Sequence, residues 1–112
     1  MTYDSTMAWR VRDALAGELS GEPLTEKAMF GGLAFLVGGQ MAVAVSGHGG
    51  LLVRIDPADA DTLVAPPGVD RADMGRGPTN GWLRVADAAV DDDHELARWV
   101  RTGVERVRHL AG

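Results

Sequence analysis

The sequence contains no cysteine among its 112 residues. This absence excludes disulfides, zinc–thiolate sites, iron–sulfur clusters and thiol catalysis, and it fits a reducing compartment. Basic residues are also few, because eleven Lys and Arg stand against sixteen Asp and Glu and give a net charge of −5. A protein that binds a nucleic-acid backbone needs the opposite balance or a clustered basic surface. The composition therefore disfavours a nucleic-acid partner.

Long apolar runs and targeting signals are missing as well. The N-terminal residues MTYDSTMAWRVR lack the apolar run and the small-residue cleavage site of a signal peptide. The longest mainly apolar stretch, residues 33–45, is interrupted by Gly-Gly-Gln and is too short to span a bilayer. We therefore expect no membrane partner and a cytoplasmic location. No repeat or long linker divides the chain, so residues 1–112 are predicted to form one domain.

Apolar residues at helical spacing predict a helix near the N-terminus and a short one in the middle of the chain. The first is capped by Asp4 or Ser5 and is predicted to stop at Gly17, with a positive φ at that glycine. Its Trp9 lies off the apolar stripe, where it either covers loop residues or contacts another chain. The middle helix begins after Asp56, since a proline follows this capping residue.

The C-terminal helix has the strongest local signal in the chain. Asp92 and Glu95 form a variant of the capping box, and apolar residues follow at spacings of three and four for about five turns. Gly103 lies on this apolar stripe, where a glycine costs about 1 kcal/mol relative to alanine. This cost is tolerable if another element packs tightly against the helix at Gly103.

Between residues 25 and 55 the apolar period changes to two, which predicts antiparallel strands. The bulky residues of one face are Leu33, Phe35, Val37, Met41, Val43, Val45, Leu51, Val53 and Ile55. The pair Gly38–Gly39 predicts a two-residue type I′ hairpin turn. The opposite face is predicted to carry Ala34, Ala42 and Ala44, whose small side chains allow a helix or another subunit to approach closely.

Further strands complete the predicted sheet. Gly31–Gly32 indicates a bulge or bend that leads into the alternating segment. After an irregular, Pro- and Gly-rich stretch over residues 65–81, short strands are predicted at 72–74 and 81–85. The predicted fold class is α+β, with two layers: an antiparallel sheet of about five to six strands, and N-terminal, middle and C-terminal helices.

No group of residues makes a convincing catalytic, cofactor or metal site. The acidic run 91–95 contains five candidate ligands, but consecutive helical residues point in different directions, so at most two share one ion. His48 lies in a turn without a companion nucleophile and is interpreted as solvated. The glycines lack the spacing of a phosphate-binding loop. We therefore predict no catalytic residues, no metal, no cofactor and no enzymatic activity.

The basic residues of the C-terminal helix are interpreted as a solvated, salt-bridged face. Arg98, Arg101 and Arg108 project in similar directions, but Glu95 and Glu105 dilute their charge. Weak DNA binding is the third hypothesis for this chain, and it predicts an affinity that falls steeply with salt.

Residues 25–45, TEKAMFGGLAFLVGGQMAVAV, are followed by LLVRID, a short helix, GWLRV and a final helix with a tryptophan. With its elements in this order, the sequence resembles the TfoX N-terminal domain family over nearly the whole chain. The most specific parts of the resemblance are the motifs KAMFGG (27–32) and LVR (52–54). The resemblance implies helices packed on an antiparallel sheet and a link to bacterial regulators of DNA-uptake competence. It implies no catalytic residues. Full-length members carry a second, C-terminal domain that the 112 residues do not include.

The sequence thus favours a non-enzymatic regulatory or protein-interaction module that forms a homodimer and contacts a protein partner through its sheet and loops. The candidate contact residues form a bend, with Trp82 as an exposed or half-exposed neighbour: Lys27, Met29, Phe30, Gly31 and Gly32. The structural alternative is that Met29 and Phe30 belong to the core and that the glycines form a bulge.

A second hypothesis belongs to another class of function. It is a small-molecule-binding protein or minor enzyme that uses a cleft beside the loop of residues 65–81. Arg54, Arg76 or His48 would supply its polar contacts.

Overall fold

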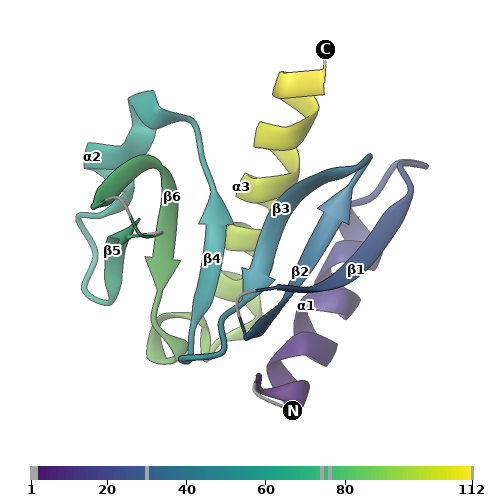
Figure 1. The fold of residues 1–112 in the computed structure, drawn as a ribbon, viewed down its shortest axis with the longest axis horizontal. Coiled ribbons are helices and arrows are strands. Elements are labelled where there is room, and N and C mark those ends of the chain that lie inside the picture. The colour runs from purple at the N-terminus through teal and green to yellow at the C-terminus, as the bar shows by residue number, and fades with distance from the viewer. Residues whose placement is uncertain (1–2, 30, 74, 76, 112) are drawn as a thin grey trace.

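Six antiparallel strands and the helices that cover one of their faces make up the fold (Figure 1). The computed structural model describes residues 3–29, 31–73, 75 and 77–111. The elements are α1 (Ser5–Glu18), β1 (Leu24–Met29), β2 (Gly32–Val37), β3 (Gln40–Val45), β4 (Leu51–Arg54), η1 (Pro57–Asp59), α2 (Ala60–Leu63), β5 (Val69–Asp73), β6 (Pro78–Val85), η2 (Asp87–Val90) and α3 (Asp93–Ala111).

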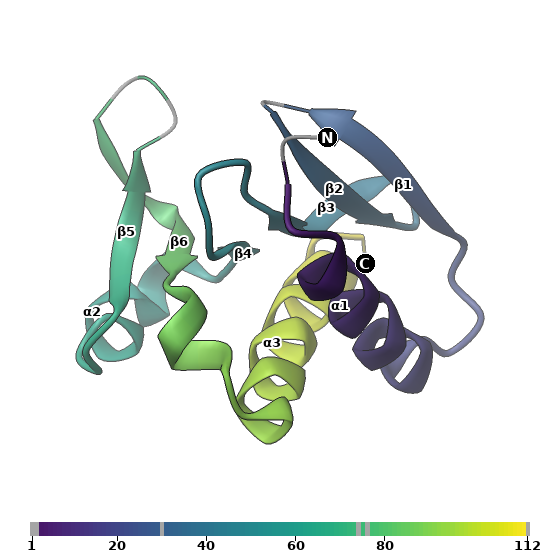
Figure 2. The ribbon, with the colours of Figure 1, turned by 90° about the horizontal axis from the view of Figure 1, so that it is seen from below.

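The strands lie in the order β1-β2-β3-β4-β6-β5, and every neighbouring pair is antiparallel. Figure 2 shows α1 and α3 side by side on one side of this sheet, while α2 lies beside β5 and β6. The predicted α+β class with two layers is confirmed. None of the helices in the described ranges has both the length and the apolar character needed to cross a membrane.

The core lies between the sheet and the pair of long helices. Phe35, Val43, Val53 and Leu83 come from four strands and are fully buried there. The helices contribute Met7, Ala8, Val11, Leu15, Leu96, Trp99, Val100, Val104 and Val107. The alternation of β2, β3 and β4 therefore buries their bulky face against α1 and α3. A helix or another subunit was expected on the alanine face, but neither of these two helices lies there (Figure 2).

Gly103 is the point of closest approach between α3 and the sheet. A Cβ atom at this glycine would lie 2.5 Å from the carbonyl oxygen of Ala42 and 3.0 Å from Cγ1 of Val43. The condition under which a glycine is tolerable here is thus met, and the partner in the tight contact is β3.

A β-bulge changes the predicted faces of β3. Phe35 pairs with Val43 and Leu36 pairs with Met41, so Ala42 is an extra residue in β3. Met41 therefore lies on the face opposite the helices, whereas Ala42 is fully buried in the core. Both assignments made from strict alternation were wrong, because one inserted residue reverses the side-chain pattern beyond it.

The ends of several elements also differ from expectation. Asp4 caps α1 as predicted, accepting hydrogen bonds from the amides of Thr6 and Met7. The helix continues past Gly17, which does not have a positive φ, and ends at Leu19 in extended conformation. Leu19 is half-buried and packs against the core.

Strands β5 and β6 are longer than predicted and take up part of the Pro- and Gly-rich stretch. The prediction began them at residues 72 and 81, but they begin at Val69 and Pro78. Pairing between these two consecutive strands extends both of them, and this effect is not visible in the composition of either segment alone.

Candidate functional site

The sheet face opposite α1 and α3, called the open face below, carries one row of side chains across all six strands. The register aligns Lys27, Ala34, Ala44, Leu52, Arg84 and Asp70 from β1 to β5. The two central alanines are small, and they are flanked by a leucine and two cations. The side chains of the row are therefore short on β2 and β3, and charged toward the two edges of the sheet.

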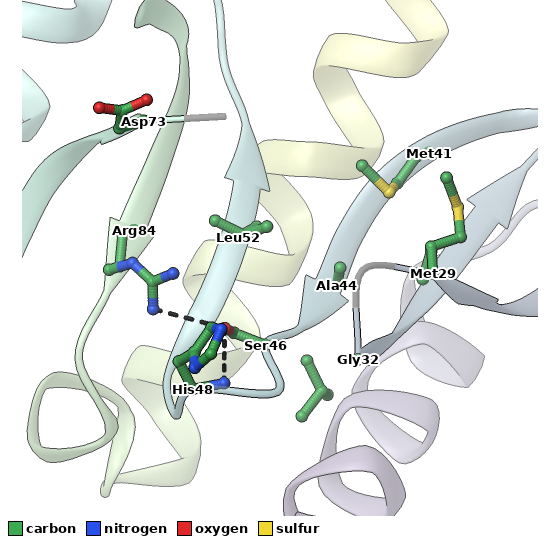
Figure 3. A pocket seen from close by; sticks show the side chains of 11 residues that line it. Met29, Gly32, Met41, Ala44, Ser46, His48, Leu52, Asp73 and Arg84 are labelled. Atoms are coloured by element: carbon green, nitrogen blue, oxygen red, sulfur yellow. Dashed lines mark hydrogen bonds between the residues drawn. The ribbon is translucent and has the colours of Figure 1, made fainter. Parts of the chain in front are cut away.

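A pocket of about 240 Å³ lies over the middle of this row. Gly32, Ala34 and Ala44 line its base, where Ala34 is 1% and Ala44 7% exposed. Two methionines and Leu52 supply larger apolar side chains around this base, as Figure 3 shows. The alanines are therefore buried within the single chain, and they form the floor of a hollow rather than a flat surface.

One end of the pocket is polar. Ser46, His48 and Arg84 come together there (Figure 3). Nη1 of Arg84 donates to the carbonyl oxygen of Gly49 at 3.0 Å and to Oγ of Ser46 at 3.4 Å. The serine oxygen also accepts a hydrogen bond from the backbone N–H of His48 at 3.1 Å. The two hydrogen bonds from Nη1 hold the guanidinium of Arg84 at the polar end of the pocket.

The turn that holds this polar end is anchored from outside the sheet. Oδ1 of Asp87, in η2, accepts a hydrogen bond from the backbone N–H of Gly50 at 2.9 Å. Gly50 has a φ of 76°, and a Cβ there would lie 2.5 Å from the carbonyl oxygen of Val85. Glycine is therefore required at this position, and the turn is held close to β6.

The cations of the open face differ from the other described cations in their ion pairing. Of the eleven Lys and Arg, Arg76 lies outside the described residues, which leaves ten. Seven of these ten form an ion pair with a carboxylate. In the described ranges the three without such a pair are Lys27, Arg54 and Arg84, and the register places all three on the open face.

Arg54 and Trp82 form a second polar–aromatic contact on this face. The guanidinium carbon lies 5.1 Å from the centre of the indole ring, within range of a cation–π interaction. Nη1 of Arg54 also donates to Gln40 and to the carbonyl oxygen of Met41, each at 3.4 Å. All of these partners are uncharged.

The structure brings together some of the predicted contact residues. Met29 and Gly32 line the pocket, and Lys27 is exposed on the same face. Trp82 is half-buried on that face as well, but four strand spacings separate it from β1, about 19 Å along the sheet. Trp82 is therefore not a direct neighbour of the bend. Phe30 lies outside the described residues.

The two glycines of the bend have separate structural roles. Gly31 has a φ of 76° and lies in the turn between β1 and β2. A Cβ at Gly32 would lie 2.2 Å from the carbonyl oxygen of Val45, and one at Gly47 would lie 2.3 Å from that of Gly31. The bend predicted at this pair is thus a hairpin connection packed closely on the turn after β3.

The sequence interpretation missed six pocket residues, Met41, Val45, Ser46, Leu52, Asp73 and Arg84. A signal for two of them was present. Leu52 is apolar at a position that alternation assigns to the open face, and Arg84 is a cation between two apolar residues of a predicted strand. The cleft hypothesis named His48, Arg54 and Arg76 beside residues 65–81, and of the described residues in that stretch only Asp73 lines this pocket. His48 lines the pocket and Arg54 does not, while Arg76 lies outside the described residues.

The basic residues of α3 have carboxylate partners, as the salt-bridged interpretation predicted. Arg98, Arg101 and Arg108 pair with Glu95, Glu18 and Glu22, respectively. Hydrogen bonds from Arg108 and from the backbone N–H of Ser20 lower the pKa of Glu22 to about 2. Across the described residues, no group of three or more His, Asp and Glu side chains is placed to hold a metal ion.

Comparison with protein families identifies a known domain in this chain. The model of the TfoX N-terminal domain matches residues 14–107, from the second half of α1 almost to the end of α3. No curated protein and no solved structure matches the chain.

Proposed function

The chain belongs to the TfoX N-terminal domain family, and on that premise we propose that it is a non-enzymatic regulatory module that binds an acidic protein partner through its open face. The observation that carries this proposal is the location of Lys27, Arg54 and Arg84. The chain has an excess of acidic residues, yet these three cations have no carboxylate partner within the described ranges. Complementary charge on a partner would steer its approach and fix its orientation.

The apolar residues between these cations suit a protein interface. Met29, Leu36, Met41 and Leu52 are half-buried on the open face. Methionine, aromatic residues and arginine are enriched in interface cores, and tryptophan and arginine are frequent among the residues that dominate binding energy. We assign the largest contribution to Trp82.

A homodimer remains a prediction, and we place its contact elsewhere. A twofold contact through the open face would bring Lys27, Arg54 and Arg84 toward copies of themselves, and like charges at an interface cost several kcal/mol. Trp9, which is 62% exposed on α1, is the alternative contact. Light scattering at tens of micromolar tests the dimer, and a Trp9→Ser variant tests this location. The mass of one chain for the wild type would disprove the dimer.

Site-specific photo-crosslinking in the cells that naturally produce the protein tests the proposed surface. A benzophenone side chain at Thr25, which is exposed on the open face, is expected to give a discrete protein adduct. The same group at Ala16, which is exposed on α1, is the matched control and should give none. Lys27→Glu combined with Arg54→Glu should abolish the Thr25 adduct.

Two outcomes would disprove the proposed surface. One is an adduct of the same mass and yield from both Thr25 and Ala16. The other is an adduct at Thr25 that survives both charge reversals. Circular dichroism of each variant establishes that the loss of an adduct does not come from unfolding.

A further inference from the structure

We infer that the pocket on the open face is a binding site for a small organic acid, with Arg84 binding its carboxylate and the apolar floor binding its body. The site does not depend on the protein partner proposed above. Its two ends have different chemistry: Gly32, Ala34 and Ala44 at the base are apolar, and Ser46 and Arg84 are hydrogen-bonding groups. A ligand that fits both must itself have an apolar and an anionic end.

Arg84 is held in place but retains hydrogen-bonding capacity. Both of its hydrogen bonds in the described ranges start from Nη1 and end on neutral oxygens, those of Ser46 and Gly49. Nε and Nη2 keep three N–H donors, and their fork geometry matches a carboxylate. A guanidinium that is already oriented loses less side-chain entropy when it binds an anion.

Two acidic residues, Asp70 and Asp73, lie on β5, the strand next to that of Arg84, but neither forms an ion pair with its guanidinium. Asp70 is directly opposite Arg84 in the register, but the two form no ion pair within 4.0 Å. Asp73 also lines the pocket, and its Oδ1 accepts hydrogen bonds from the backbone N–H groups of Gly75 and Gly77 at 2.9 and 3.1 Å. Figure 3 shows Asp73 away from Ser46 and His48, so the anionic end of a ligand belongs beside Arg84.

Size restricts the class of acid further. The volume of about 240 Å³ is below the range of about 300–1,000 Å³ that is typical of sites for drug-sized ligands. The methionine side chains of Met29 and Met41 are flexible and adapt to different apolar shapes. We therefore assign the site to a monocarboxylate with one short alkyl chain or one ring.

A titration followed by amide NMR tests this inference with three probes. Phenylacetate is expected to bind saturably, with the largest shift changes at Ser46, Leu52 and Arg84. Acetate lacks the apolar body and phenylacetamide lacks the charge, so each is expected to bind at least about tenfold more weakly. Arg84→Gln should weaken phenylacetate by about tenfold or more, whereas Arg98→Gln, on the outer face of α3, should leave its affinity unchanged.

A second variant separates binding from folding. Ala44→Leu fills the base of the pocket without touching Arg84, and it is expected to abolish phenylacetate binding while the amide spectrum remains dispersed. The inference is overturned if phenylacetate gives no saturable shift at about 10 mM, or if phenylacetamide or acetate binds as tightly. It is also overturned if Arg84→Gln or Ala44→Leu leaves the affinity unchanged in a folded protein. The crosslinking test changes Lys27 and Arg54, whereas the NMR test changes Arg84 and Ala44, so either proposal fails independently of the other.

Discussion

Replacing Gly103 with alanine is predicted to destabilise the protein, although alanine is the better helix former. The new methyl carbon would lie 2.5 Å from the carbonyl oxygen of Ala42, about 1 Å closer than an ordinary C···O contact. The obstacle is backbone, so α3 must move away from β3. Such overpacking costs up to about 3 kcal/mol, and helix propensity returns about 1 kcal/mol. The expected net loss is about 2 kcal/mol of unfolding free energy.

Gly17 provides the matched control for this experiment. It also lies in a helix, but nothing lies within 4 Å of a Cβ built there, and its φ is not positive. Gly17→Ala is therefore expected to stabilise the protein by about 0.5 kcal/mol. Urea unfolding of both variants gives the two free energies. A stabilisation by Gly103→Ala equal to that of Gly17→Ala would refute the tight contact between α3 and β3.

Three further predictions concern charge and turns. Arg108 lowers the pKa of Glu22 to about 2, so the pair contributes stability above about pH 4.5 that is lost as the pH falls toward 2. Glu22→Gln should flatten the dependence of the urea midpoint on pH in this range, and an unchanged slope would contradict the pairing. Asp87→Ala should cost about 1 kcal/mol and accelerate amide exchange at Gly50, since that N–H loses its acceptor. Gly38 has a φ of 59° and open space around it, so Gly38→Asn should change stability by less than about 0.5 kcal/mol, whereas Gly38→Val should cost about 1–2 kcal/mol. Equal effects of the two substitutions on the urea midpoint would be evidence against this turn conformation.

Local signals in the sequence predicted the elements whose causes are themselves local. The cap at Asp4, the turn at Gly38–Gly39 and the apolar stripe of α3 each follow from a few neighbouring residues, and the structure confirms all three. Both turn glycines have the positive φ that a type I′ turn requires. The predicted fold class depended mainly on another local signal, the period-two alternation of apolar residues between residues 33 and 55.

The pocket was not predicted because it depends on contacts between distant residues. Its wall contains Met41 only because Ala42 is an extra residue in β3, and alternation alone assigned both to the wrong face. Arg84 is 38 residues from Ser46 in sequence and is brought to it by the pairing of β4 with β6. Neither the bulge at Ala42 nor the contact between Arg84 and Ser46 produces a recognisable pattern within a single segment of the sequence.

The β-bulge at Ala42 affects both the packing of the core and the side chains of the open face. On the core side, Ala42 presents the carbonyl oxygen against which Gly103 packs. On the open face, the same insertion turns Met41 toward the pocket. A helix that is forced away from β3 at Gly103 would therefore also move the methionine at the pocket wall. Gly103→Ala should change the methyl resonance of Met41, whereas Gly17→Ala should not. An unshifted Met41 signal in a destabilised Gly103→Ala protein would show that the pocket is independent of how α3 packs.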